Sequence, residues 1–143
     1  MAEYPLPKFH FQVDWGGAKL SFTEVTGLSM EQEVIEYRHS DSKAFSKIKM
    51  PGLRKFSNLT MKRGTFQGDF DFYNWLSEIQ TDRANTRRDV VIRLLNELHE
   101  PVATWKAERC FPTKVQASDL KADGNEVAIE SIEIAIESLS LVK

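Results

Sequence analysis

The sequence predicts a single, mainly β domain with one helix. Apolar and polar side chains alternate along several stretches, with the period of two that is typical of half-buried strands. A helical period is clear only once, where Phe72, Trp75, Leu76 and Ile79 recur at i, i+3, i+4 and i+7. With 143 residues the chain is long enough to bury a core of its own, so we expect residues 1–143 to form one domain.

The first expected elements are a hairpin and a strand of unusual polarity. Alternation over residues 9–15, a Gly16-Gly17 pair and a return run over residues 19–28 predict a tight hairpin. Residues 30–39 alternate like a strand, but neither face is strongly apolar. Such a strand belongs at a sheet edge, at an interface or on a wall that faces water.

The next stretch has no apolar period. Residues 40–48 are small, polar and basic, so we expect a long exposed loop that ends in a turn at Pro51-Gly52. Loops of this length in compact domains are more often functional or disordered than idle. A strand over residues 56–66 should follow.

The helix is expected over residues 69–80, with a cap at Gly68-Asp69. Residues 89–97 are apolar on nearly both faces, which predicts a central strand. After a turn near Pro101, further β structure is expected, with a bend or an edge at Pro112. Trp15, Trp75 and Trp105 occupy positions typical of a core.

The last quarter opens with a turn at residues 123–125 and continues as a two-faced strand. Its apolar residues change face twice, which we interpret as bulges or bends near Ser131 and Ser138. Three glutamates then form an acidic face that lines solvent or meets a basic partner: Glu130, Glu133 and Glu137.

Composition excludes several classes of function. A net charge of −2 argues against general nucleic-acid binding, but bases gather between residues 38 and 63 and acids after residue 119. Opposite patches on one small domain suit self-association. The single Cys110 predicts a reduced, buried thiol. The N-terminus lacks the pattern of a signal peptide and no window suits a membrane span, so we expect synthesis in the bacterial cytoplasm and no membrane insertion.

No motif for catalysis is found. There is no phosphate-binding glycine loop, no nucleophile elbow and no histidine pair with metal-ligand spacing. Residues 119–130 imitate a calcium loop, but Lys121 stands at the third position and a strand is expected where the loop's helix should follow. We therefore expect no catalytic residue, metal, cofactor or small-molecule substrate.

Six segments, in order along nearly the whole chain, resemble the tail tube proteins of contractile-tailed phages and the inner tube proteins of extracellular contractile injection systems. They are FTEVTGL (22–28), VIEYR (34–38), MPGLR (50–54), LTMKRGTF (59–66), RDVVI (88–92) and LKADGNEVAI (120–129). The resemblance implies two antiparallel sheets packed as a barrel-like sandwich with one flanking helix, a fold shared with Hcp, the ring protein of type VI secretion.

The resemblance also implies an assembly. Six copies would form a ring, and rings would stack into a hollow tube inside a sheath, between baseplate and cap proteins. Sheath contraction would drive the rigid tube through a target envelope, and DNA or protein cargo would pass through the lumen.

Three surfaces are candidates for these contacts. We expect the ring-to-ring contact at the basic loop, through Lys43, Lys47, Lys49, Met50, Leu53 and Arg54. The acidic strand with Glu130, Glu133 and Glu137 would line the lumen or a subunit interface. The helix would face the sheath with Glu78 and nearby Asp82.

Two alternatives stay open at this point. An Hcp-like secreted ring that shelters effectors differs by the absence of a contractile sheath in the same particle. A monomeric β-barrel that binds a small ligand would need a closed apolar interior, and the polar two-faced strands argue against it.

Overall fold

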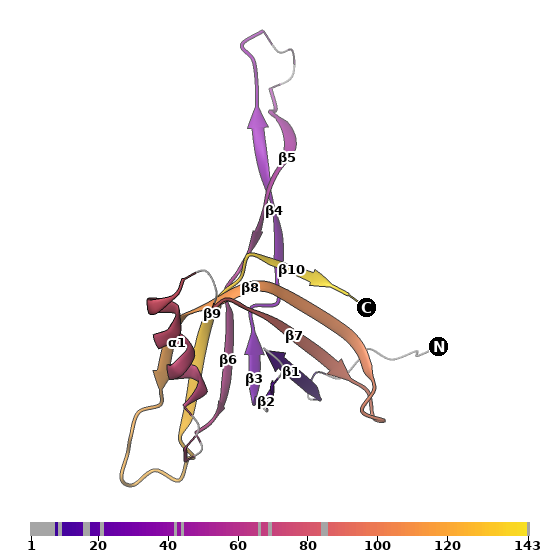
Figure 1. The fold of residues 1–143 in the computed structure, drawn as a ribbon. Coiled ribbons are helices and arrows are strands. Elements are labelled where there is room, and N and C mark those ends of the chain that lie inside the picture. Colours follow the sequence, from indigo (N-terminus) through magenta and orange to yellow (C-terminus); the bar gives the residue numbers. More distant parts are fainter. Residues whose placement is uncertain are drawn as a thin grey trace.

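The computed structural model describes residues 8, 10–15, 18–20, 22–41, 43, 45–65, 67–68, 70–83 and 86–142. These residues form ten strands and one helix (Figure 1). The elements are β1 (Phe11–Trp15), β2 (Ala18–Leu20), β3 (Glu24–Thr26), β4 (Met30–Tyr37), β5 (Ile48–Phe56), β6 (Leu59–Gly64), α1 (Asp71–Thr81), β7 (Arg88–Leu95), β8 (Pro101–Ala117), β9 (Ile129–Ala135) and β10 (Ser138–Leu141).

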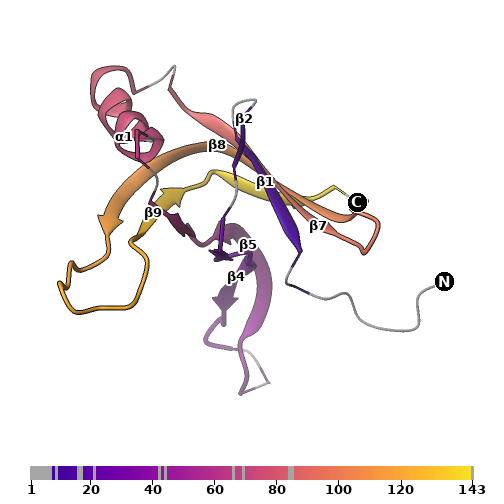
Figure 2. The same ribbon diagram turned by 90° about the horizontal axis from the view of Figure 1, so that it is seen from below.

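The long strand β8 joins two antiparallel sheets into one sandwich. The first half of β8 pairs with β7 and β10, and its second half pairs with β9. The strand order is β2-β1-β7-β8-β9-β6-β3, and among the described strands the two ends, β2 and β3, do not pair, so the barrel is not closed. Figures 1 and 2 show α1 flanking the sandwich beside β8 and β9. The predicted mainly β sandwich with one flanking helix is thus confirmed.

An aromatic cluster lies where α1 meets the sheets. The ring of Trp15 lies 4.8 Å from that of Trp75 and 5.4 Å from that of Phe72, centroid to centroid. The Trp75 indole donates a hydrogen bond to the Thr86 carbonyl at 2.8 Å, which satisfies its buried N–H. Trp15 and Trp75 are core residues as predicted, whereas Trp105 is only partly buried.

Several expected elements are confirmed. In the first hairpin Trp15 pairs with Ala18 across Gly16 and Gly17, which lie outside the described residues. The return run is divided, because β2 pairs with β1 whereas β3 crosses to pair with β6. Strand β7 lies between β1 and β8, so it is central. The register of β8 with β9 shifts after Pro112, in agreement with the predicted bend.

The predicted turn at Pro51-Gly52 is wrong. Both residues lie inside β5, and Pro51 pairs with Val34 of β4. β4 and β5 form a separate two-stranded sheet, so proline is tolerated there because neither strand has a second neighbour among the described strands. This hairpin, residues 30–56, stands away from the body (Figure 1) and is called the arm below.

The predicted bulge near Ser131 is also wrong. β9 keeps a regular register with β6 from the pair Gly64–Ile129 to the pair Leu59–Ile134. Glu130 therefore takes an inward position with Ile132 and Ile134, while Val127 lies in the connection before β9. The irregularity predicted near Ser138 is confirmed, since β9 ends at Ala135 and β10 begins only at Ser138.

The helix begins two residues later than predicted. Its N-cap is Phe70, which makes no side-chain capping bond to the described residues, and Asp69 of the expected cap lies outside them. Phe72 and Trp75 are buried, and Leu76 and Ile79 are half-buried, so the predicted apolar face is confirmed.

Candidate assembly surfaces

The arm exposes an apolar face near its outer end. Ile35 pairs with Met50 and Tyr37 pairs with Ile48, and residues two apart on a strand share a face. These four side chains therefore lie together. Each stays between 45% and 55% exposed, because nothing among the described residues covers them. We call Ile35, Tyr37, Ile48 and Met50 the arm face.

The opposite side of the arm carries charge. Glu36 lies opposite Lys49 across the two strands, and its carboxylate forms an ion pair with Nζ of Lys47 at 3.3 Å. The arm holds six bases and four acids, a net charge of +2. It is less basic than the loop alone suggested, because β4 adds glutamates opposite the lysines. All six residues predicted for ring stacking lie on the arm: Lys43, Lys47, Lys49, Met50, Leu53 and Arg54.

The connection between β8 and β9, residues 118–128, projects from the other end of the molecule (Figure 1). It holds three acids and one base, a net charge of −2. Its apolar Leu120 and Val127 are 90% and 76% exposed. The two projections thus carry opposite net charge at opposite ends of one chain.

The three glutamates of the last strands do not form one acidic face. Without a bulge, residues 130 and 133 point to opposite sides of β9. The Glu130 carboxylate lies inside, 2.8 Å from Nε of Arg63, and both side chains are less than 5% exposed. The Arg63 guanidinium also lies 4.2 Å from the centre of the Phe72 ring, a cation–π contact that ties the pair to α1.

The other two glutamates have outward positions. The Glu133 carboxylate accepts a hydrogen bond from the Asn58 amide at 3.1 Å. Glu137 lies at the interruption between β9 and β10, where Arg87 contacts it at 3.0 Å and Arg109 at 2.8 Å. The expected acidic surface is therefore reduced to Glu133 and a Glu137 that is shared by two arginines.

The two acids predicted to face the sheath lie at the end of α1. Glu78 is paired with Arg88 at 3.5 Å, and half of its side chain is exposed. Asp82 is the C-cap residue, and its N–H donates to the Glu78 carbonyl at 3.0 Å. Both acids are accessible on the outside of the chain, and their role toward a sheath stays a prediction.

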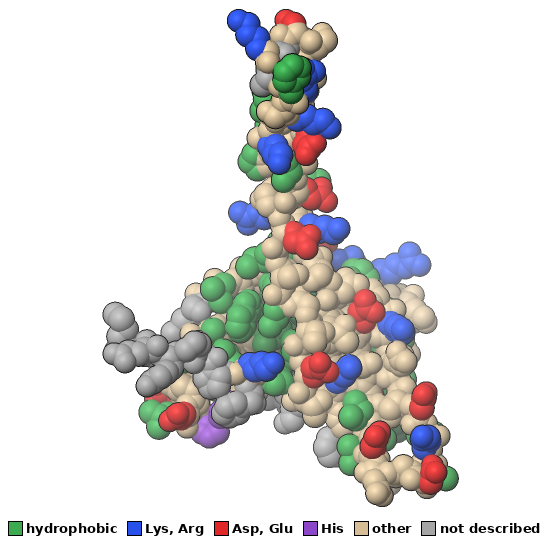
Figure 3. Space-filling model, turned by 180° about the vertical axis from the view of Figure 1, so that it is seen from behind, with side chains coloured by type: hydrophobic (Ala, Val, Ile, Leu, Met, Phe, Trp, Pro, Cys, Tyr) green, Lys and Arg blue, Asp and Glu red, His purple; other side chains and the backbone are tan. Residues whose placement is uncertain are grey.

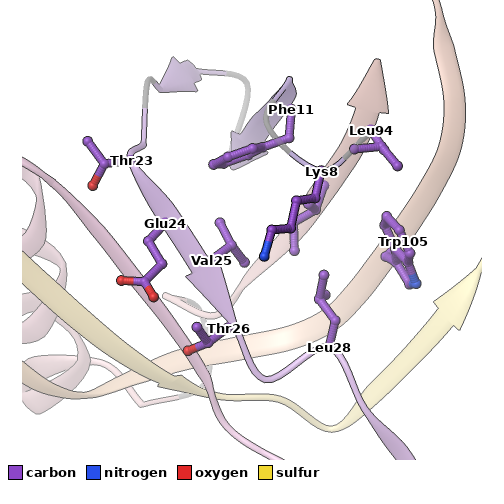
Figure 4. Close-up of a pocket in the computed structure, with 10 residues that line it drawn as sticks. Lys8, Phe11, Thr23, Glu24, Val25, Thr26, Leu28, Leu94 and Trp105 are labelled. Atoms are coloured by element: carbon purple, nitrogen blue, oxygen red, sulfur yellow. The ribbon is translucent and has the colours of Figure 1, made fainter. Parts of the chain in front are cut away.

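An open apolar cleft of about 530 Å³ separates β3 from β1, β7 and β8. Figure 4 shows Phe11, Val25, Leu28, Leu94 and Trp105 around this space, with Lys8 among them. Sequence reasoning missed the cleft, because the lining residues Phe11, Leu94 and Trp105 alternate along their strands as core residues would. The only signal was that the return run contains Val25 and Leu28, whose β3 strand leaves the hairpin for the other sheet.

Two observations on the described residues concern thiol reactivity and metal binding. Burial and the charge of Asp89 raise the pKa of the Cys110 thiol from 9.0 to about 12, so the thiol is protonated and unreactive at neutral pH. Among the described residues there is no group of three side chains suited to a metal ion, and no helix long and apolar enough to cross a membrane.

Comparisons with known proteins agree on one class. Two solved structures are 30% identical to the chain: an extracellular contractile injection system, the PVC sheath-tube complex in its extended state, and the tube-terminating cap of the anti-feeding prophage. The first match covers 97% of this chain and 92% of that one, with a TM-score of 0.87. The second covers 99% and 93%, with a TM-score of 0.88.

The fold extends to more distant proteins. Hcp1 from Flavobacterium johnsoniae is 10% identical to this chain, and the match covers 94% of this chain and 95% of Hcp1. The TM-score is 0.57, and this likeness shows the shared fold alone. A comparison with curated protein sequences found no match.

These similarities define a structural tube protein of contractile injection systems. A profile of the T4-like virus tail tube protein gp19 family matches residues 7–140. The chain belongs to this family, and it is a structural tail tube subunit.

Proposed function

We propose that six copies of the chain form a ring and that rings stack into the hollow inner tube of a contractile particle. A sheath would surround the tube, and baseplate and cap proteins would bind its ends. The observation that carries this proposal is the arm. An isolated two-stranded sheet is at best marginally stable in water, and among the described residues the arm pairs with no third strand. It has the form of an element completed by another copy.

The two charged ends support stacking. The arm carries +2 and residues 118–128 carry −2, and they project from opposite ends of the chain (Figure 1). A head-to-tail contact of this kind joins different surfaces of each copy and can extend without limit. Exposed ion pairs contribute little individually, so the apolar Met50 and Leu53 supply most of the contact energy between rings.

The stacking proposal is tested by changing the end of the arm. Deletion of residues 42–46, or Lys43→Glu with Lys47→Glu, should leave rings that fail to extend into long tubes in electron micrographs. Lys114→Glu is the matched control, because Lys114 is an exposed base on β8 and not on the arm. Tubes of normal length from the arm variants would refute the stacking role.

A sheath contact is proposed for the end of α1. Glu78→Lys with Asp82→Lys should leave tubes intact but prevent sheath subunits from assembling around them. The control is Glu97→Lys with Glu100→Lys, which changes two exposed acids in the turn between β7 and β8. Normal sheath assembly on the α1 variant would end this assignment.

The lumen is proposed to be acidic, with Glu133 as its first candidate because Glu130 is buried. An acidic bore would repel DNA and let it slide, or let protein cargo pass. A charge-resolved map of the assembled tube should show negative potential along the bore, and a neutral or basic bore would contradict this. A contractile sheath in the purified particle distinguishes this tube from an Hcp-like secreted ring.

A further inference from the structure

The apolar cleft lies beside the root of the arm. Leu28, which lines the cleft, is two residues before the first residue of β4. Figure 3 shows hydrophobic side chains gathered on the body directly below the arm. A space of about 530 Å³ with walls from Phe11, Leu94 and Trp105 is large enough to receive several apolar side chains.

The arm of the same chain cannot cover this cleft. Ile35 and Tyr37 lie five and seven residues beyond the start of β4, and a strand rises about 3.3 Å per residue. The arm face is therefore roughly 17 to 23 Å from the root, and Figure 1 shows the arm directed away from the body. Within the described part of the chain, an uncovered apolar face and an uncovered apolar cleft are thus present that cannot meet each other.

Charges at the two surfaces are complementary. Two charged residues line the cleft, Lys8 and Glu24. The Glu24 carboxylate is paired with Lys62 at 3.4 Å, whereas Lys8 has no ion pair with the described residues. Glu33 precedes Ile35 by two residues on β4, so it extends the arm face toward the root, and it likewise lacks an ion pair within the described part of the chain. Docking of the arm face on a cleft would bring this carboxylate to the rim that holds Lys8.

We propose that the arm face of one copy, Ile35, Tyr37, Ile48 and Met50, docks on the cleft of a neighbouring copy, with Glu33 directed to Lys8. The proposal rests on the proposed self-assembly and names an acceptor for the apolar arm face, in addition to the charge contact of the arm with residues 118–128. Because donor and acceptor are distant in one chain, each copy gives its arm to one neighbour and receives an arm from another. Such a contact closes into a ring or continues as a filament.

The fluorescence of Trp105, which lines the cleft, can report this contact. The chain has three tryptophans, and Trp15 and Trp75 are 1% and 0% exposed, so acrylamide should quench mainly Trp105 in the dilute, unassembled chain. Trp105→Phe, measured on the same unassembled sample, assigns the signal. In assembled rings or tubes the docked arm should protect Trp105 from the quencher. Assembled particles in which Trp105 stays as quenchable as in the unassembled chain would overturn the docking, while the tube itself would stand.

Two variants test the arm face without touching the core. Ile35→Asp with Met50→Asp should keep the fold by circular dichroism but leave Trp105 quenchable and raise the concentration needed for assembly at least about tenfold, which is the effect of 1.4 kcal/mol. The matched control is Val34→Asp, because Val34 lies on the opposite side of the arm and is 56% exposed; this variant should assemble with Trp105 protected. An equal loss in both would refute the choice of face.

A charge exchange tests the acceptor. Lys8→Glu and Glu33→Lys should each weaken assembly, and the two together should restore it. Failure of the double variant to recover would contradict the Lys8 contact. Deletion of residues 2–7 tests another occupant: if it alone exposes Trp105 in the unassembled chain, the N-terminal segment fills the cleft and the docking is overturned. Failure of the wild-type chain to assemble at all would instead refute the proposed function.

Discussion

The buried pair of Arg63 and Glu130 is predicted to be the most sensitive polar contact in the fold. Its two charges lie 2.8 Å apart and are less than 5% exposed. Removal of Arg63 leaves the buried Glu130 carboxylate without this counterion, which typically costs about 3–5 kcal/mol. Replacement of both by apolar side chains is often neutral or stabilising. The single variant should therefore be strongly destabilised and the double variant nearly as stable as the wild type.

Arg63→Met is the informative single change, because the Arg63 guanidinium is the group that contacts the buried Glu130 carboxylate. We expect it to lower the free energy of unfolding by about 3–5 kcal/mol. At roughly 2–4 °C per kcal/mol for a chain of this size, the midpoint should fall by roughly 10 °C. The double variant Arg63→Met with Glu130→Ile should have a free energy of unfolding within about 1 kcal/mol of the wild type. Any remaining loss reflects the missing cation–π contact with the Phe72 ring.

Urea denaturation of the dilute, unassembled chain measures both quantities in a double-mutant cycle. The reasoning is refuted if Arg63→Met costs less than about 1 kcal/mol, or if the double variant is as unstable as the single one.

Three further outcomes follow from the described contacts. The Cys110 thiol should resist thiol reagents at pH 8 until the chain is unfolded. Its pKa is raised from 9.0 in the unfolded chain to about 12 in the folded chain, so the stability that the protonated thiol contributes is complete below pH 9 and is lost as pH rises toward 12. Between these pH values the free energy of unfolding should therefore fall more steeply than that of Cys110→Ala. Gly27→Ala should lower the free energy of unfolding in urea by at least about 2 kcal/mol, because φ of Gly27 is +98° and the new Cβ would lie 2.1 Å from the Asn58 carbonyl oxygen. Gly124→Ala is the control and should be nearly neutral, because no atom lies nearer than 3.5 Å to its new Cβ. Glu137→Gln should change stability by less than about 1 kcal/mol, because the carboxylate between Arg87 and Arg109 is half-exposed. A loss as large as that of Arg63→Met would show that exposure does not separate the two sites.

The elements that the sequence predicted well are those with a local cause. The helix followed from four apolar residues at helical spacing, and the central position of β7 followed from a run that is apolar on both sides. Residues 30–39 were expected at an edge, at an interface or on a wall facing water, because neither of their faces is strongly apolar, and β4 is exposed along its whole length.

The errors share a different cause, which is partners that are distant in sequence. Pro51-Gly52 is a strong turn signal, but the pairing of β5 with β4 outweighs it, and the edge position removes the penalty for proline. Glu130 reads as a solvent-facing acid until Arg63, 67 residues away, is placed beside it. The cleft could not be found from the pattern at all, since it depends on β3 crossing from one sheet to the other.

The central claim is that this chain builds a tube from copies of itself. Electron microscopy of the purified chain, with light scattering on the same sample, tests it most directly. The account predicts six-fold rings or hollow tubes. A chain that stays a monodisperse monomer at high concentration would contradict it.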